Sequence, residues 1–254
     1  MIVIPAQAQT FPKLTGRVVD GANMLSDAQK IDIDSKLGAL EAQSGRQLVV
    51  ATVPSLEGRT IEDYGYRLGR TWAIGQKGKD DGVILIVAPT ERKVRIETGY
   101  GARVFLTDAV SSVIIRDAIT PSFKAGDMGG GIVAGVDQIS SFLKLPEAEA
   151  AKRAAAVGAS EQARAKQRDK PNFVSVIFWM FIILFVILPM VRGAAGGGRR
   201  RRGRSGPMIL WGPGLGGGGW GGGGGFGGGG GFGGGGGFSG GGGSFGGGGA
   251  SGGW

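Results

Sequence analysis

The sequence contains no histidine and no cysteine. A chain without these residues has no Ser-His-Asp or Cys-His nucleophile system, no disulfide bond, and no imidazole or thiolate ligand for a metal. We therefore expect neither zinc nor haem as a cofactor. A metal ion held by side chains would have oxygen ligands, which suit Ca²⁺, Mg²⁺ and Mn²⁺.

Negative charge is also in the minority, because 20 Asp and Glu residues stand against 29 Lys and Arg residues, for a formal net charge of +9. Much of the positive charge lies in two clusters, at 164–170 and 192–204, that flank one apolar segment. This position indicates the border of a membrane and gives no reason to expect nucleic-acid binding.

Composition divides the chain into five parts. Residues 1–9 end in the small-x-small pattern of a signal-peptidase site but lack a basic start. We interpret them as a signal-peptide remnant, and a frayed N-terminus is the alternative. Residues 10–145 have the composition of one globular domain, and residues 146–171 form a polar and basic linker or helix. Residues 172–192 are apolar over roughly the 20 residues that a transmembrane helix needs.

Residues 193–254 begin with a basic block and continue as glycine interrupted by single aromatic residues. Such a tail has too little apolar surface to offset the entropy of ordering, so we expect it to be disordered. Its spaced rings suit weak self-association, and a solvated tail without a defined role is the alternative. The four arginines at 199–202 are typical of a cytoplasmic border. With the signal-peptide remnant, they predict a single-pass protein whose domain is extracytoplasmic and whose tail is cytoplasmic.

Within residues 10–145, strands alternate with helices. The pattern predicts strands at 17–20, 46–54, 83–88 and 94–97 and helices at 26–45, 60–75, 109–119 and 128–143. We expect the first helix to bury Ile31, Leu37 and Leu40, and Pro121 to stop the third. Strands that are apolar throughout indicate helices on both faces of a mixed sheet. The predicted fold is therefore α/β, a three-layer α/β/α sandwich, with one C-terminal transmembrane helix and a disordered Gly-rich tail.

The last two predicted strands, joined by a short polar turn at 89–93, form an antiparallel hairpin. In such a hairpin the start of the first strand lies beside the end of the second. Asp80 and Asp81 should therefore meet Glu97 and the turn at 99–101.

Five carboxylates are the candidate metal ligands: Asp80, Asp81, Glu97, Asp108 and Asp127. Converging carboxylates repel one another, and a hard divalent cation, Ca²⁺ in particular, removes that repulsion. Three residues of the hairpin turn lie near the proposed ligand or partner: Gly99, Tyr100 and Gly101. The glycines permit a tight turn, and Tyr100 packs over the sheet edge.

Each ligand also has a simpler interpretation. Asp108 and Asp127 suit helix N-caps, Asp80 and Asp81 a polar turn, and Glu97 the solvated face of an edge strand. No third glycine follows Gly99 and Gly101 at the spacing of a dinucleotide fingerprint, so no nucleotide cofactor is expected. No activated nucleophile can be named, and the catalytic residues, if the chain has any, are unknown.

Nine motifs in chain order resemble the TPM domain, a family that includes a thylakoid-lumen phosphatase-like protein, a photosystem-repair protein and a modulator of acetylcholine receptors. The motifs lie at 16–20, 25–26, 55–58, 61–64, 72–77, 80–83, 95–101, 106–108 and 121–127, within about residues 11–143. Two departures are Asp81, where Asn is common, and Ala102-Arg103-Val104, where Leu-Glu-Gly is usual. The first adds charge to the proposed site and the second removes a carboxylate near it.

The resemblance implies an α/β/α sandwich outside the cytoplasm and a Ca²⁺ site among the aspartates. Plant relatives imply an acid-phosphatase activity. Bacterial members with one membrane helix and a similar tail imply a location in the bacterial inner membrane.

Three hypotheses follow. The leading one is a membrane-anchored accessory protein, in the bilayer through 172–192, whose domain binds a membrane protein complex during its assembly, repair or modulation, with Ca²⁺ structuring the site. The second is a divalent-metal-dependent, acid phosphatase-like hydrolase. The third is a structural protein that self-associates through its Gly/aromatic tail.

Overall fold

The computed structural model describes residues 11–168, 173–188 and 240–254. The chain divides into two compact units, one formed by Met1–Gln167 with Gly236–Trp254 and the other by Arg168–Gly235. The predicted signal-peptide remnant at 1–9 lies outside the described residues.

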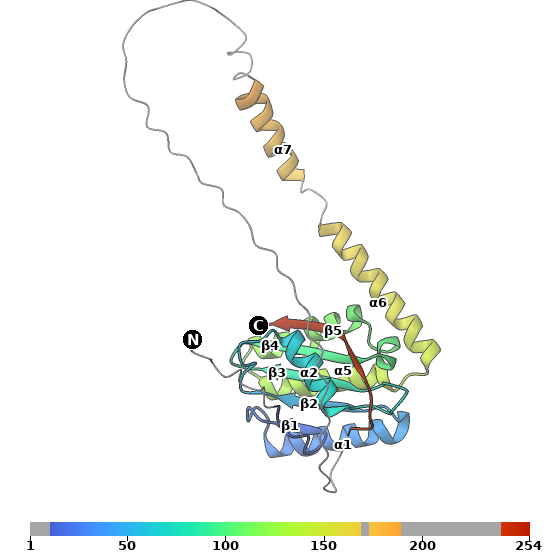
Figure 1. Ribbon diagram of the computed structural model, residues 1–254. Helices are drawn as coiled ribbons and strands as arrows, with labels where there is room; N and C mark the ends of the chain where they lie inside the picture. Colours follow the sequence, from blue (N-terminus) through green and yellow to red (C-terminus); the bar gives the residue numbers. More distant parts are fainter. Residues whose placement is uncertain (1–10, 169–172, 189–239) are drawn as a thin grey trace, which may run out of the picture. The chain divides into compact units, whose positions relative to one another are not determined.

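The first unit is built on a mixed sheet, as predicted, and the sheet has five strands, one more than the sequence predicted (Figure 1). Its strands, in spatial order, are β1 (Val18–Asp20), β2 (Leu48–Thr52), β3 (Val83–Ala88), β4 (Lys93–Gly99) and β5 (Phe245–Gly253). The first three run parallel, β4 runs antiparallel to β3, and β5 runs antiparallel to β4. The sheet therefore begins near the N-terminus and ends with the C-terminus.

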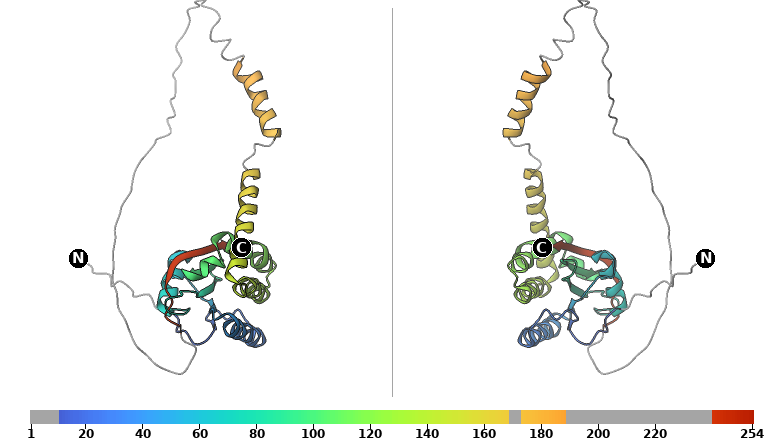
Figure 2. Two further views of the ribbon diagram at one scale, coloured as in Figure 1. Left: turned by 90° about the vertical axis from the view of Figure 1, so that its right-hand side faces the viewer. Right: turned by 90° about the vertical axis from the view of Figure 1, so that its left-hand side faces the viewer.

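The prediction that the whole tail is disordered is wrong for residues 240–254, because they include β5 at the edge of the sheet (Figures 1 and 2). The physical reason is that β4 supplies a row of backbone donors and acceptors, so the order of β5 does not depend on the apolar surface of the tail alone. The rest of the tail, residues 193–239, lies outside the described part of the chain.

Helices flank the sheet and connect its strands. In chain order they are α1 (Asp27–Ser44), α2 (Ile61–Trp72), the short 3₁₀-helix η1 (Gly101–Val104), α3 (Asp108–Ile114), the π-helix η2 (Ile115–Ile119), α4 (Thr120–Lys124), α5 (Met128–Leu143) and α6 (Glu147–Arg168). The capping signatures begin two of them as predicted, because Ser26 caps α1 in a capping box and the Thr60 side chain caps α2.

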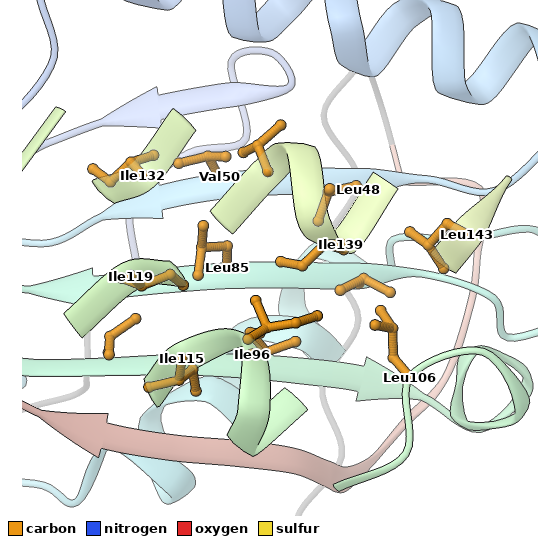
Figure 3. Close-up of a cluster of buried hydrophobic side chains, with 14 of the residues drawn as sticks. Leu48, Val50, Leu85, Ile96, Leu106, Ile115, Ile119, Ile132, Ile139 and Leu143 are labelled. Atoms are coloured by element: carbon orange, nitrogen blue, oxygen red, sulfur yellow. The ribbon is translucent and has the colours of Figure 1, made fainter. Parts of the chain in front are cut away.

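Two apolar cores lie on opposite faces of the sheet. Alternate residues of β2 show the division: Leu48 and Val50 join the core beneath α1, α3 and α5, whereas Val49 and Ala51 join the core beneath α2. Figure 3 shows the first of these cores, with side chains from the sheet and the covering helices interleaved. Helices on both faces explain why the central strands are apolar throughout.

Two details differ from the sequence-based expectations. Ile31 is 71% exposed, and α1 buries Ile33 with Leu37 and Leu40, because those three recur at the helical spacing of three to four residues. Pro121 does not stop the third helix; the chain continues through η2 into α4. Proline is tolerated there because it lies in the first turn of α4, where the backbone N–H groups need no partner within the helix.

In the second unit the structure describes α7 (Phe173–Ile182) and the π-helix η3 (Ile183–Ile187). Most of the large apolar side chains between Ile177 and Leu188 are exposed. Among the helices that the structure describes, none is long and apolar enough to span a membrane. The transmembrane helix at 172–192 is thus not confirmed and stays a prediction, since 172 and 189–192 lie outside the described residues.

Candidate functional site

The hairpin brings Asp80 and Asp81 beside the turn at 99–101, as predicted. Strand β3 pairs with β4 so that Ile84 lies opposite Glu97. Beyond the strand ends, the backbone N–H of Gly101 donates to the Asp80 carbonyl oxygen at 2.9 Å. A side chain at Gly99 or Gly101 would overlap the backbone of residues 79–80. The two glycines are therefore required by this close approach.

The five predicted metal ligands have separate protein partners. Asp81 Oδ1 accepts from the backbone N–H of Gln76 at 2.8 Å, and Asp127 Oδ1 accepts from that of Gly130 at 2.8 Å, which caps α5. The N-cap of α3 is Thr107, which leaves the Asp108 carboxylate for another contact. Glu97 is fully buried, so its interpretation as the solvated face of an edge strand is wrong.

The arrangement does not fit a shared cation while β5 is in place. Within the described ranges there is no group of three or more acidic side chains that could hold a metal ion. Two of the five carboxylates instead accept hydrogen bonds from the tail: Asp80 Oδ1 from the N–H of Ser244 and Asp108 Oδ1 from the N–H of Gly249, each at 2.8 Å. The Ca²⁺ site stays a prediction, and the observed role of these two side chains is to hold the C-terminal segment.

A buried ion pair lies under the same segment. Arg95 Nε donates to Glu97 Oε2 at 2.6 Å, and both side chains are almost completely buried. Burial raises the pKa of the Glu97 carboxyl above its ordinary value, although the neighbouring Arg95 charge opposes that rise. The Arg95 guanidinium also donates to the carbonyl oxygens of Gly247 at 3.2 Å and Gly248 at 3.4 Å. The pair therefore supports the backbone of the tail from beneath.

The tail occupies a surface formed by β4, helix α2 and the loop that follows α2, which we call the groove. Residues 240–244 run along that loop. The backbone N–H groups of Gly242 and Gly243 donate to the Ala73 carbonyl oxygen at 2.8 and 3.0 Å. In return, the N–H of Lys77 donates to the Gly241 carbonyl oxygen at 2.9 Å. These bonds involve only main-chain groups, so they fix the path of the tail without depending on its side chains.

Strand β5 then pairs with the whole of β4. Gly253 lies opposite Lys93, Ala250 opposite Ile96 and Phe245 opposite Gly99, with an irregularity in register next to Thr98. In addition, the Ser251 hydroxyl donates to a carboxylate oxygen of Glu62 in α2. The segment is therefore bound by backbone pairing along β4, interrupted at the irregularity next to Thr98, with polar contacts on both sides.

Two aromatic side chains anchor the ends of the segment on opposite faces of the sheet. Phe245 is only 1% exposed and lies in the core beneath α2, beside Gly69. The ring of Trp254 packs edge-on against Phe123 of α4, with 4.5 Å between ring centroids, next to the other core. The segment is thus held at both ends by buried or partly buried rings.

At four of the glycines between the anchors, an added side chain would meet atoms of the domain at less than 3 Å. An added Cβ would lie 2.5 Å from the Tyr100 ring at Gly246 and 2.6 Å from Ile115 Cγ2 at Gly252. At Gly248 it would overlap the Arg103 guanidinium, and at Gly249 the Ile96 carbonyl oxygen. The predicted packing of Tyr100 over the sheet edge is therefore observed against a tail glycine. Chemically, the groove recognises an extended, glycine-rich backbone between two aromatic rings.

Sequence reasoning missed four residues that make this site: Glu62, Arg95, Phe245 and Trp254. The available signal was the spacing of two aromatic residues by nine positions, with only glycine, alanine and serine between them. Nine positions are the length of a sheet-spanning strand, but nothing local indicated which edge the strand would join.

Comparison with known proteins adds a family. A model of the TPM domain matches residues 18–142, which lie within the first unit. No match was found among the curated proteins.

Similar solved structures include the N-terminal domain of a P. gingivalis protein, with 33% identity, a TM-score of 0.48, and coverage of 51% of this chain and 82% of that chain. The N-terminal domain of the cg2496 protein from Corynebacterium glutamicum is 19% identical, with a TM-score of 0.41 and coverage of 55% and 86%. The BA42 protein of Bizionia argentinensis is 18% identical, with a TM-score of 0.42 and coverage of 47% and 81%.

Proposed function

The chain belongs to the TPM domain family, and on that premise we propose that it is a binding protein whose sheet edge at β4 receives an extended segment of a partner. The observation that carries this proposal is β5 itself. A stretch from the far end of the sequence, made mostly of glycine, completes the sheet by pairing with β4. Addition of an extended segment to an exposed sheet edge is an established mode of peptide recognition.

The walls of the groove support this proposal. Helix α2 presents Gly65 and Gly69 toward β4 and β5, where an added Cβ would lie 3.1 Å from Arg95 Cδ and 2.6 Å from Phe245 Cγ. Two glycines one helical turn apart cost helix stability, roughly 1 kcal/mol each relative to alanine. Gly65 leaves room for the buried Arg95 side chain, which contacts β5, and Gly69 leaves room for the ring of Phe245, which belongs to β5.

Attachment to a membrane is the second part of the proposal. We propose that residues 172–192 hold the protein at a bilayer and that the partner is a membrane protein complex. The exposed apolar side chains of α7 and η3 support contact with lipid. They are consistent with an accessory role beside a membrane complex, in its assembly, repair or modulation.

The side of the membrane on which the tail lies needs a different proposal from the sequence-based one. Strands that share hydrogen bonds must occupy one compartment, and β4 pairs with β5. Pairing within one chain therefore favours a domain and a C-terminal strand on the same side of the membrane. We propose, from the sequence-based expectation for the domain, that this side is outside the cytoplasm. In that arrangement the apolar segment enters the bilayer without carrying the last residues of the tail across it.

Hydrolysis receives no such support. The carboxylates that would hold a catalytic cation accept hydrogen bonds from the protein, as Asp80 and Asp108 do from the tail. No second function is proposed for this site.

The experiment uses a fluorescent peptide with the sequence of residues 240–254 and the full-length chain carrying Phe245→Ala, which weakens the hold on its own tail. We expect saturable binding of the peptide, measured by fluorescence anisotropy, and loss of at least tenfold in affinity when the peptide itself carries Phe245→Ala. A folded Phe245→Ala chain that binds neither peptide would overturn the proposal.

A further inference from the structure

We propose that the C-terminal segment, residues 240–254, is a built-in competitor of the partner: the groove is selective for this segment, and a partner binds only after the segment leaves. This inference rests on the proposed function, because it concerns the same groove. The inference adds that the groove prefers a particular sequence and that residues 240–254 of the same chain have that sequence.

The first step is the spacing of the anchors. Phe245 enters the core beneath α2, whereas Ala250 and Trp254 contact the core on the opposite face. A strand places residues an odd number of positions apart on opposite faces, and Phe245 is five residues from Ala250 and nine from Trp254. The irregularity next to Thr98, where Gly248 pairs with Thr98 but Phe245 pairs with Gly99, adds two residues to β5 and so keeps this alternation. A partner segment must therefore carry two aromatic residues at this separation and tolerate a bulge after the first.

The second step is the exclusion of side chains between the anchors. Gly249 has a φ of +114°, a conformation that L side chains rarely adopt, and a Cβ there would overlap the Ile96 carbonyl oxygen. Gly252 has a negative or extended φ angle, yet a Cβ there would lie 2.6 Å from Ile115 Cγ2, a buried side chain of the core. At Gly248 the overlap is with the Arg103 guanidinium, the end of a flexible side chain that can move aside. Pairing of backbones at a sheet edge by itself tolerates most side chains. This groove also discriminates against side chains at particular positions of the bound segment, so it is more selective for sequence.

The third step is charge. Asp80, Asp108 and Glu62 each accept a hydrogen bond from the segment, and the Arg95 guanidinium donates to two of its carbonyl oxygens. These side chains therefore satisfy main-chain and hydroxyl groups rather than side-chain charges. These contacts require no charged side chain in the segment, and an uncharged segment satisfies all of them.

The fourth step is attachment. Because the segment belongs to the same chain, its concentration at the groove is set by the connecting residues and is of mM order for a short flexible connection, less for a longer one. A free partner segment of equal affinity must reach a comparable concentration to displace it. Partners that are brought close to the protein, as in a membrane complex, can meet that condition.

The test uses the absence of cysteine in the natural sequence, so that an introduced pair forms the only disulfide. Lys93→Cys with Gly253→Cys places two thiols on directly opposite residues of β4 and β5. We expect oxidation to give an intramolecular disulfide in monomeric protein and to lower binding of the residue 240–254 peptide at least tenfold relative to the reduced protein. Lys93→Cys with Ser35→Cys, which lies on α1, is the control and should form no such bond.

Three results would overturn the inference. A disulfide that forms only between two copies would show that the segment is exchanged rather than retained. A disulfide that leaves peptide binding unchanged would show that the segment is no competitor. If the wild-type chain and the full-length Phe245→Ala chain bound the peptide equally well, the segment would again be no competitor, but the proposed function would stand. If the Phe245→Ala chain did not bind the peptide, the proposed function itself would be overturned.

Selectivity has its own arm in the same assay. A peptide with Gly249→Ala should bind the Phe245→Ala chain at least tenfold more weakly than the native peptide. The matched control is a peptide with Gly253→Ala, because a Cβ there would lie 3.1 Å from the Arg92 carbonyl oxygen and needs only a small adjustment. Equal affinity of the Gly249→Ala peptide and the native one would overturn the selectivity.

Discussion

Phe245 of β5 lies against Gly69 of α2, with its ring in the place that a side chain at position 69 would occupy. A Cβ at Gly69 would lie 2.6 Å from Phe245 Cγ. The two residues are far apart in the sequence, but their contact accounts for both. Glycine in the middle of a helix is unfavourable by itself, and here it makes room for the Phe245 ring. The ring has no local partner in the glycine-rich tail, and here it packs against the helix.

Gly69→Ala tests this relationship. Alanine raises intrinsic helix stability by about 1 kcal/mol, but its methyl group displaces the Phe245 ring. We expect faster hydrogen exchange in residues 240–254, measured by mass spectrometry, with no loss of protection in β2 and β3. The matched control is Gly158→Ala in α6, where an added Cβ meets nothing within 4 Å. Unchanged exchange of the tail in Gly69→Ala would contradict the observed packing.

Phe245→Ala removes the anchor itself. Truncating a buried phenylalanine costs about 3–5 kcal/mol, which corresponds to more than a hundredfold in the equilibrium between docked and undocked tail. Limited proteolysis should then cleave within residues 240–254 while the domain stays intact. Phe245→Leu keeps part of the buried surface, so the rate at which the protease cleaves its tail should lie between the rates for wild type and for Phe245→Ala. Resistance of the Phe245→Ala tail to the protease would show that the ring is dispensable.

The buried ion pair predicts a non-additive double variant. Arg95→Met leaves the Glu97 carboxylate buried without its partner, so we expect a loss of about 3–5 kcal/mol in the free energy of unfolding. Arg95→Met with Glu97→Leu removes both charges and should recover much of that loss. Denaturant unfolding of the three proteins measures the difference, and equal losses in the single and double variants would show that the charges do not act as a pair.

Acid should release the tail in part through Glu62. The hydrogen bond from the Ser251 hydroxyl lowers the pKa of the Glu62 carboxyl below its ordinary value of 4.5, against an opposing effect of burial. A carboxyl whose pKa is lowered by docking stabilises the docked state above its ordinary pKa, and that contribution is lost as pH falls through the lowered value. We expect the docking of residues 240–254 to weaken as the pH falls from 6 to 3. Hydrogen exchange of these residues, measured across that pH range, monitors the docking.

Ser251→Ala is the control for Glu62. It removes the hydroxyl that lowers the pKa and leaves the other carboxylates of the groove in place. The variant should show a smaller decrease in docking between pH 6 and pH 3 than wild type. Identical pH profiles for the two proteins would mean that Glu62 makes no contribution.

Membrane topology can be tested with single cysteines in the cysteine-free chain. Ser35→Cys reports the side of the domain, and Gly253→Cys reports the side of the C-terminal strand. In sealed membrane vesicles we expect a membrane-impermeant maleimide to label both or neither, because β4 and β5 share a compartment. Labelling of one position alone, with both labelled after lysis, would contradict pairing within the membrane-bound chain.

Much of the fold could be predicted from local patterns, because those patterns express short-range physics. Capping boxes, apolar runs and the hairpin turn depend on neighbours within about ten residues, so the boundaries of α1, α2, β3 and β4 follow closely from the sequence. The prediction that Ile31 is buried was an error of helical phase: Ile33 precedes Leu37 by four residues and shares its face of the helix, whereas Ile31 precedes it by six and does not.

The candidate site could be predicted only in part. The hairpin correctly placed Asp80 beside the turn at 99–101, because antiparallel pairing determines which ends meet. The tail groups that donate to the Asp80 and Asp108 carboxylates, the N–H of Ser244 and the N–H of Gly249 respectively, were not predictable in the same way. A backbone N–H donor has no signature in the sequence, so Ser244 and Gly249 could not be told from any other residue of the tail.

Residue types and local patterns specify α1, α2, α3 and α5, the first four strands and the two apolar faces of the sheet, and they exclude imidazole and thiolate chemistry. These follow from residue type and local periodicity, which act whatever the rest of the chain does. Long-range packing is what makes residues 245–253 a strand and brings Asp80, Asp108 and Glu62 into contact with residues 244–251. Glycine carries almost no conformational preference of its own, so its structure is imposed by the edge of β4 and by the two rings that find their places on opposite faces of the sheet.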